Sequence, residues 1–173
     1  MRIDEFVPQT FRATSSAVTP GATPQDVFTI SGNSTTNVYV QKMGISTTQT
    51  TAGINAWFVA KRSTANTGGT SASVTVVPLN ANYSAHATVL QYTANPTAGT
   101  LIGNLWGGFV EAPAPATAGI GNLIVEVDFQ SMLGQPLALL STADVLAWNF
   151  NGAALPTGLS VIAYVQWVEY SKT

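Results

Sequence analysis

Short runs of β-branched and aromatic residues recur along this chain, and the gaps between them are rich in Gly, Pro and Asn. Val27–Ile30 and Asn37–Gln41 are two such runs, while Asn95-Pro96 and Gly107-Gly108 stand in two of the gaps. A period of two places alternate side chains on opposite faces of a strand, and Gly, Pro and Asn supply the conformations of tight turns. The pattern predicts an all-β protein.

Further runs of the same character predict the remaining strands. They lie at Ile45–Gln49, Ala56–Lys61, Ser73–Val77, Thr88–Tyr92, Thr100–Trp106, Leu123–Phe129, Pro136–Leu140, Asp144–Phe150 and Leu159–Tyr170. Short strands at regular spacing favour a single sandwich or barrel. In Gln130–Leu140, the nearest candidate for a helix, Gly134 and Pro136 limit any helix to about one turn.

The N-terminal segment differs from the rest in composition, so we expect an arm over residues 1–25 and a β-sandwich domain over residues 26–173. The arm combines charges that a buried strand would not tolerate unpaired with aromatic residues that a solvated tail would not need. Such a mixture suits docking onto another protein, with these residues as the predicted contacts: Arg2, Asp4, Glu5, Phe6, Phe11 and Arg12. The alternative is that the segment folds back as an extra edge strand of its own domain.

Charged residues are scarce. The 173 residues include six Lys or Arg and eight Asp or Glu, 8% in all, against about 25% in an ordinary soluble domain. A hydrophobic content of 46% with a net charge of -2 excludes intrinsic disorder, and so few cations cannot form the basic stripe of a nucleic-acid binder. No charged residue occurs from Ser63 to Val110, which predicts a neutral surface that offers little repulsion between copies.

Targeting signals are not expected in this sequence. Asp4 and Glu5 stand where a secretory signal would carry basic residues, and no apolar stretch follows them. Every apolar run is interrupted before 18 residues, so no membrane-spanning helix is expected. We therefore expect synthesis in the host cytoplasm. A neutral, exterior type of surface without an export signal is typical of a virion component released by lysis.

The sequence contains few of the residues and motifs that enzymes use for catalysis. The chain has one histidine, His86, and no cysteine, and it lacks the motifs of serine hydrolases, zinc enzymes and nucleotide-binding loops. We therefore expect no enzyme activity, no catalytic residue, no cofactor and no metal site. The best carboxylate pair is Glu126 and Asp128, which should share one strand face opposite Val125 and Val127. That pair favours a solvated outer face over a glycosidase couple or part of a calcium site.

The aromatic residues leave two roles open, a buried core or interface and a sugar-binding surface. The set comprises Trp57, Trp106, Trp148, Trp167, Tyr39, Tyr83, Tyr92, Tyr164 and Tyr170. In alternating strands such residues usually fill a core or a subunit interface, although they could also form a sugar-stacking platform. The adjacent cations Lys61 and Arg62 are expected to solubilise a strand end or to pair with another subunit.

Two stretches carry a resemblance to a known group. Thr51–Thr70 with Val74–Leu79, and then Tyr92–Gly103, resemble small virion proteins of tailed bacteriophages of the head decoration or cement type. The resemblance implies an all-β fold, a single antiparallel β-sandwich that is jelly-roll-like, and a homo-oligomer, with a trimer favoured. It implies a structural role on the capsid surface, with the major capsid protein or another virion protein as partner. Neither a nucleic acid nor a membrane is an expected partner.

Two other functions stay open from the sequence. The first is a glycan-binding, receptor-binding module of a phage tail or fibre. The second is a polysaccharide hydrolase that uses Glu126 and Asp128.

Overall fold

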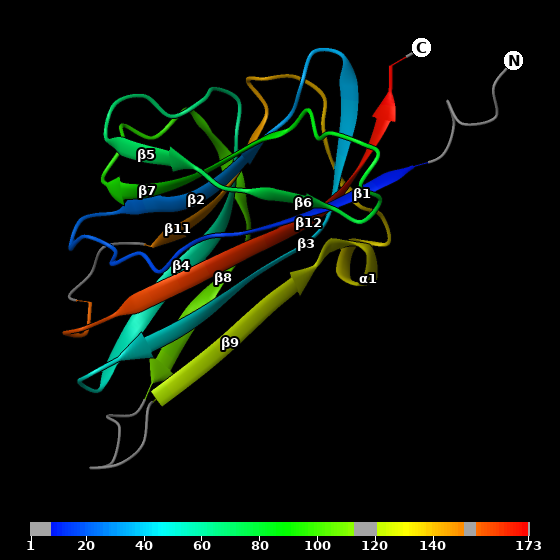
Figure 1. The fold of residues 1–173 in the computed structure, drawn as a ribbon. Helices are drawn as coiled ribbons and strands as arrows, with labels where there is room; N and C mark the ends of the chain where they lie inside the picture. Colours follow the sequence, from blue (N-terminus) through cyan, green and yellow to red (C-terminus); the bar gives the residue numbers. More distant parts are fainter. Residues whose placement is uncertain (1–7, 113–120, 151–154, 173) are drawn as a thin grey trace, which may run out of the picture.

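The structure, a computed structural model, describes residues 8–112, 121–150 and 155–172. These residues form strands and one single-turn helix, α1 (Phe129–Leu133). The strands are β1 (Gln9–Thr14), β2 (Gln25–Ser31), β3 (Thr36–Gln49), β4 (Gly53–Arg62), β5 (Thr70–Ser73), β6 (Val76–Pro78), β7 (Thr88–Ala94), β8 (Leu101–Ala112), β9 (Gly121–Asp128), β10 (Leu137–Leu139), β11 (Val145–Phe150) and β12 (Ser160–Ser171). Figure 1 shows them in two facing layers.

Every strand pair in the two sheets is antiparallel. The first sheet, sheet A, has the order β10-β3-β12-β1-β6, and β9 also pairs with β3. The second, sheet B, has the order β5-β7-β2-β11-β4-β8. The predicted antiparallel β-sandwich is confirmed.

The connectivity is that of a jelly roll. Sheet A contains the row β1-β12-β3-β9, and sheet B contains the row β2-β11-β4-β8. These eight strands cross between the sheets in the order of two Greek keys, which defines the jelly roll. The inserted strands β5 and β7 extend sheet B beyond β2, and β6 extends sheet A beyond β1.

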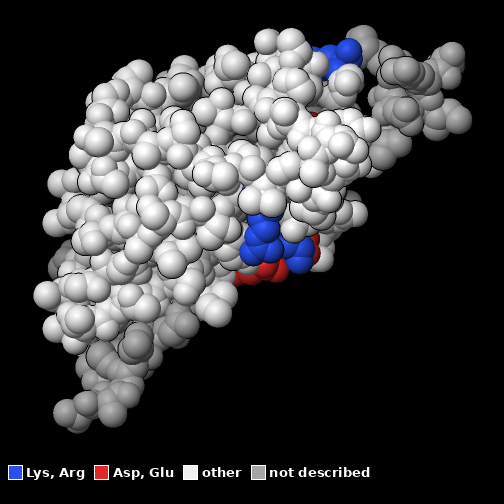
Figure 2. Space-filling model, viewed as in Figure 1, with Lys and Arg blue, Asp and Glu red and all other residues white. Residues whose placement is uncertain are grey.

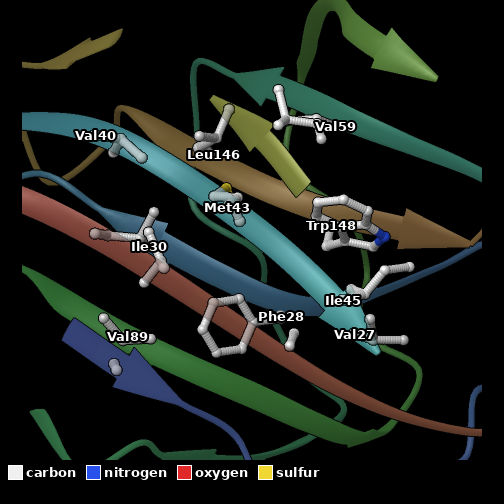
Figure 3. Close-up of a cluster of buried hydrophobic side chains, with 14 of the residues drawn as sticks. Val27, Phe28, Ile30, Val40, Met43, Ile45, Val59, Val89, Leu146 and Trp148 are labelled. Carbon is white, nitrogen blue, oxygen red and sulfur yellow. The ribbon is translucent and has the colours of Figure 1, made fainter. Parts of the chain in front are cut away.

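The core lies between the sheets and is filled by the inward side chains of both. Val40, Met43 and Ile45 of β3 face Phe28 of β2 and Trp148 of β11 (Figure 3), and all five are buried. The Trp148 ring stacks on the ring of Trp57, with centroids 5.1 Å apart. Large apolar side chains that are removed from water in this way supply most of the stability of a domain without disulfides.

The predicted domain boundary near Asp26 is wrong, because β1 belongs to the sandwich. β1 pairs with β12 along one edge and with β6 along the other. Its residues alternate between buried and exposed, and Phe11, predicted as a docking residue, is 1% exposed and stacks on Trp167. Of the charges that indicate an arm, Arg12 is the one within the described residues, and it lies on the exposed face of the strand. The fold-back alternative is correct in kind, although β1 is an inner strand of sheet A.

Four of the predicted arm contacts lie outside the described residues. They are Arg2, Asp4, Glu5 and Phe6. Their docking role stays a prediction.

Two other expectations differ from the structure in detail. Asn37–Gln41 and Ile45–Gln49 are one strand, β3, because the residues between them continue to pair with β12. Ser73–Val77 is divided between β5 of sheet B and β6 of sheet A, so the chain crosses from one layer to the other within it. The expected single helical turn is present, and it ends at Gly134, whose φ of 72° favours glycine.

Candidate functional site

The outer face of sheet A brings together polar side chains from four strands. Arg12 of β1 is opposite Gln166 of β12, which is opposite Lys42 of β3, which is opposite Asp128 of β9. A β-bulge lies next to this row. Gln166 is opposite Lys42 and Trp167 is opposite Val40, so Gln41 is an extra residue of β3. Both Gln41 and Lys42 are therefore only partly buried on the outer face, and a bulge of this kind redirects side chains toward a site.

A charged cluster occupies the centre of this face. Lys42 Nζ lies 3.2 Å from Glu126 Oε1 and 3.1 Å from Asp128 Oδ2. The hydroxyl of Tyr164 donates to Glu126, and the guanidinium of Arg12 lies over the Tyr164 ring, 4.5 Å from its centroid. In Figure 2 the coloured atoms of this cluster stand out on a face that is otherwise almost uncharged. The predicted shared face of Glu126 and Asp128 is confirmed, opposite the buried Val127.

Gly44 is required beneath Tyr164. A Cβ at this position would lie 2.3 Å from the phenol ring, which is too close for any contact. The absent side chain lets the ring lie flat across β3 and reach Glu126 on β9.

The electrostatics of the cluster hold both carboxyl groups ionised. The hydrogen bond from Tyr164, together with Lys42, lowers the pKa of Glu126 despite its partial burial. The backbone hydrogen bond from Ser131, followed by Lys42, lowers the pKa of Asp128. A glycosidase needs one carboxylic acid with a raised pKa as its proton donor. The cluster has the character of a structural ion-pair network.

Tyr164 provides a measurable signature of this network. Burial, followed by the hydrogen bond to Glu126, raises the pKa of Tyr164 from 10.0 to about 12. Because the folded value exceeds the unfolded one, the stabilisation is complete below pH 10 and should be lost as the pH rises toward 12. Titration of tyrosine Cζ signals by ¹³C NMR should show one resonance that shifts near pH 12 and disappears in Tyr164→Phe. A Tyr164 resonance that titrates near pH 10 would contradict the network.

Beside the charged cluster lies a groove between two tyrosines, called here the tyrosine groove. It has a volume of about 530 Å³ and is lined by Asn37, Tyr39, Gln41, Gln130, Pro136, Val168 and Tyr170. Tyr39 of β3 and Tyr170 of β12 meet edge to face, with ring centroids 5.5 Å apart and an interplanar angle of 87°. The buried Val168 is opposite Tyr39 and two residues before Tyr170, on the same face of β12. Gln130 and Pro136 border the groove from α1 and from the segment before β10.

A second hollow adjoins the first. It measures about 280 Å³ and is lined by Tyr39, Leu133, Gln135, Pro136, Leu137 and Ala138. Because Tyr39 and Pro136 border both hollows, the concave surface continues from β12 across β3 toward β10.

The edge of sheet B carries an exposed apolar surface of a different kind, called here the apolar edge. Its exposed apolar side chains are Ile54 of β4, with Leu101, Ile102, Trp106 and Phe109 of β8. Trp106 is opposite the inward-facing Val59 and Phe109 is opposite Ala56, so these two rings lie on opposite faces of the edge strand. Phe109 is 80% exposed and Ile102 is 61% exposed. β8 is the last strand of the sheet, and its outer side pairs with no strand of the described chain. Between Leu101 and Val110 the strand has no charge and no proline, and two bulges, at Leu105 and Ile102, interrupt its pairing with β4.

The tryptophans divide between the core and this edge. Trp57, Trp148 and Trp167 are buried, as expected for residues of alternating strands. Trp106 is 44% exposed on β8. The two tyrosines of the groove form the other accessible aromatic group, in which Tyr170 is 41% exposed and Tyr39 is partly buried.

The cations at the end of β4 pair within the chain, which makes the expectation of a solubilising end or an intersubunit pair wrong. Lys61 Nζ lies 3.2 Å from Asp144. Arg62 binds Asp26 through two hydrogen bonds of 2.7 and 2.6 Å, and Asn66 and Asn149 donate to the same carboxylate. Asp26 is fully buried, so this network fixes the loop after β4 on sheet B.

His86 is half-exposed in the loop before β7. Its Nδ1 lies 3.1 Å from the buried carboxylate of Glu169, which also accepts hydrogen bonds from the backbone N–H groups of His86 and Ala87. These contacts fasten the loop before β7 to the end of β12.

Neither a metal cluster nor a membrane-spanning helix is seen in the described part of the chain. No three His, Asp or Glu side chains there are grouped to hold a metal ion. No helix there is long and apolar enough to span a bilayer.

Comparisons with models of protein families, with curated proteins and with solved structures gave no match to this chain.

Proposed function

We propose that this protein is a structural virion protein, a decoration or cement subunit of a bacteriophage capsid, and that it acts by self-association and binding. The apolar edge is the observation that carries this proposal. An interface core is typically depleted of charge and rich in aromatic and aliphatic side chains. Trp106 and Phe109 have that character, and both lie within the uncharged stretch from Ser63 to Val110.

The backbone of β8 supports the same proposal. A long edge strand offers unpaired N–H and C=O groups that can add another strand, and proteins that stay single usually block such an edge with charge or proline. β8 spans 12 residues, and between Leu101 and Val110 it has no charge and no proline. A second copy meets no like charge along this part of the edge, so we propose a homo-oligomer, with a trimer favoured.

The fold is compatible with the proposed location. Jelly rolls of eight strands occur in viral capsid proteins and in lectins, which by analogy supports a particle role without assigning one. The major capsid protein, or another virion protein, is the proposed partner. The sparse charge suits close packing on a particle surface.

A charge placed on the apolar edge tests the proposal. In Phe109→Lys the new ammonium would be desolvated between copies, so the variant should sediment as a monomer at micromolar concentration, where we expect the natural protein to sediment as an oligomer. Val77→Lys is the matched control, since Val77 is 58% exposed on β6, away from β8. The control should retain assembly and binding to capsids that lack the protein.

Two results would overturn the proposal. One is a natural protein that stays monomeric at micromolar concentration and does not bind capsids lacking it. The other is a Phe109→Lys variant that assembles and binds as fully as Val77→Lys.

A further inference from the structure

We propose that the tyrosine groove binds a neutral oligosaccharide. The groove lies on the outer face of sheet A, whereas the apolar edge belongs to the last strand of sheet B. A ligand there would give the protein a binding activity in addition to self-association.

The polar groups of the groove are available to a ligand. Within the described residues, the hydroxyls of Tyr39 and Tyr170 and the side-chain amides of Asn37 and Gln130 take part in no hydrogen bond. Gln41 accepts one from Gln166 through Oε1, 3.0 Å away, and its amide nitrogen has no partner there. In the adjacent charged cluster, by contrast, Lys42, Glu126 and Asp128 are already paired. Unpaired groups therefore converge where the surface is hollow.

The chemical class of the ligand follows from the lining. A pyranose ring has a face of C–H bonds, which packs on aromatic rings, and a rim of hydroxyls that both donate and accept hydrogen bonds. Tyr39 and Tyr170 supply the rings, and the three amides can each donate and accept. No Asp, Glu, Lys or Arg borders the groove along the described chain, so neither an anionic nor a cationic ligand finds a counter-charge.

The dimensions favour more than one sugar unit. The main hollow, about 530 Å³, falls within the range of small-molecule sites, roughly 300–1,000 Å³. The second hollow continues it past Tyr39 and Pro136. A linear oligosaccharide could pass over the Tyr39 ring with one unit in each hollow.

The groove is held in shape before any ligand arrives. Tyr39 and Tyr170 stand on neighbouring strands in fixed register and brace each other edge to face. Gln41 is oriented by the bulge and by its bond to Gln166. Groups that stand on strands and are already oriented lose little conformational entropy on binding.

An array of neutral and acidic oligosaccharides, followed by NMR titration of the hits on the full chain, tests this inference. We expect neutral members to bind and to shift backbone amide signals of β3, β12 and α1. Tyr170→Ala removes a stacking ring and should weaken binding by about tenfold. Val77→Ala is the control, because it removes an exposed apolar side chain from β6 that does not line the groove, and it should leave binding unchanged.

A second variant separates a lost site from a lost fold. Gln130 is exposed on α1, so Gln130→Arg should obstruct the groove without a loss of thermal stability, and it should weaken binding as Tyr170→Ala does. The inference is overturned if no neutral oligosaccharide binds at millimolar concentration, if acidic members bind equally well, or if both groove variants bind like the natural protein. Failure of self-association in Phe109→Lys would not affect this result, so the two proposals fail separately.

Discussion

Replacing Phe11 with alanine should lower the free energy of unfolding by about 3–5 kcal/mol, as expected for the loss of a large buried aromatic side chain. Phe11 is 1% exposed and its ring stacks on that of Trp167, with centroids 5.7 Å apart. The cavity would open at the point where β1 meets β12, the pairing that holds the N-terminal strand in sheet A. Urea unfolding at one fixed protein concentration measures the change.

Arg12→Ala is the control on the opposite face of the same strand. Arg12 is exposed, and its contact with the Tyr164 ring should contribute only about 0.5–1 kcal/mol. A large loss for Phe11→Ala with a small loss for Arg12→Ala identifies β1 as a core strand. Equal, small losses would instead fit the docking arm that the sequence predicts.

Replacing Asp26 with asparagine should cost about 3–5 kcal/mol of unfolding free energy, because it leaves the guanidinium of Arg62 buried without its counter-charge. The change removes no volume, so the loss would report the charge and the hydrogen bonds alone. The carboxylate of Asp26 accepts from Arg62, Asn66 and Asn149. An asparagine at this position would place its own NH₂ group against at least one of these N–H groups, and that N–H would lose its acceptor.

The same substitution at Asp128 is the control. Asp128 also pairs with a cation, Lys42, but both side chains are partly exposed and the solvent screens them. Asn at this position can still cap α1 by accepting from Ser131. Thermal unfolding should show a much larger loss for Asp26→Asn than for Asp128→Asn, and equal losses would show that the buried pair contributes no more than a surface pair.

The sequence predicts an element correctly where a local pattern of side chains is enough to define it. The run Asp144–Phe150 became β11, and Gly134 ended the single turn of α1 where expected. The sequence predicts an arm in place of β1 because it takes the charges of residues 1–12 together, whereas a strand can bury Phe11 and expose Arg12 at the next position. Charge density describes a segment, and burial is decided residue by residue.

The candidate surfaces could not be predicted, because they depend on strand order. Tyr39 and Tyr170 are far apart in the sequence and meet only because β12 pairs with β3. The bulge at Gln41 changes which residues face outward, and no local signal marks it. The exposure of Phe109 likewise depends on β8 being the last strand of its sheet, since the same sequence in an inner strand would be covered.

The position of β12 has a consequence for how the chain acquires its structure during synthesis. β12 is made after every other described strand, yet it lies between β3 and β1 in the middle of sheet A. Without it, the described pairings of that sheet form two separate pieces, one containing β10, β3 and β9 and the other containing β1 and β6. The nascent chain must therefore wait for β12 before this layer can close, and pairings between such distant segments are intrinsically slow to form. A ribosome that stops before Ser160 would release a polypeptide with the inward side chains of β1 and β3 uncovered, which is a substrate for chaperones, proteases or aggregation.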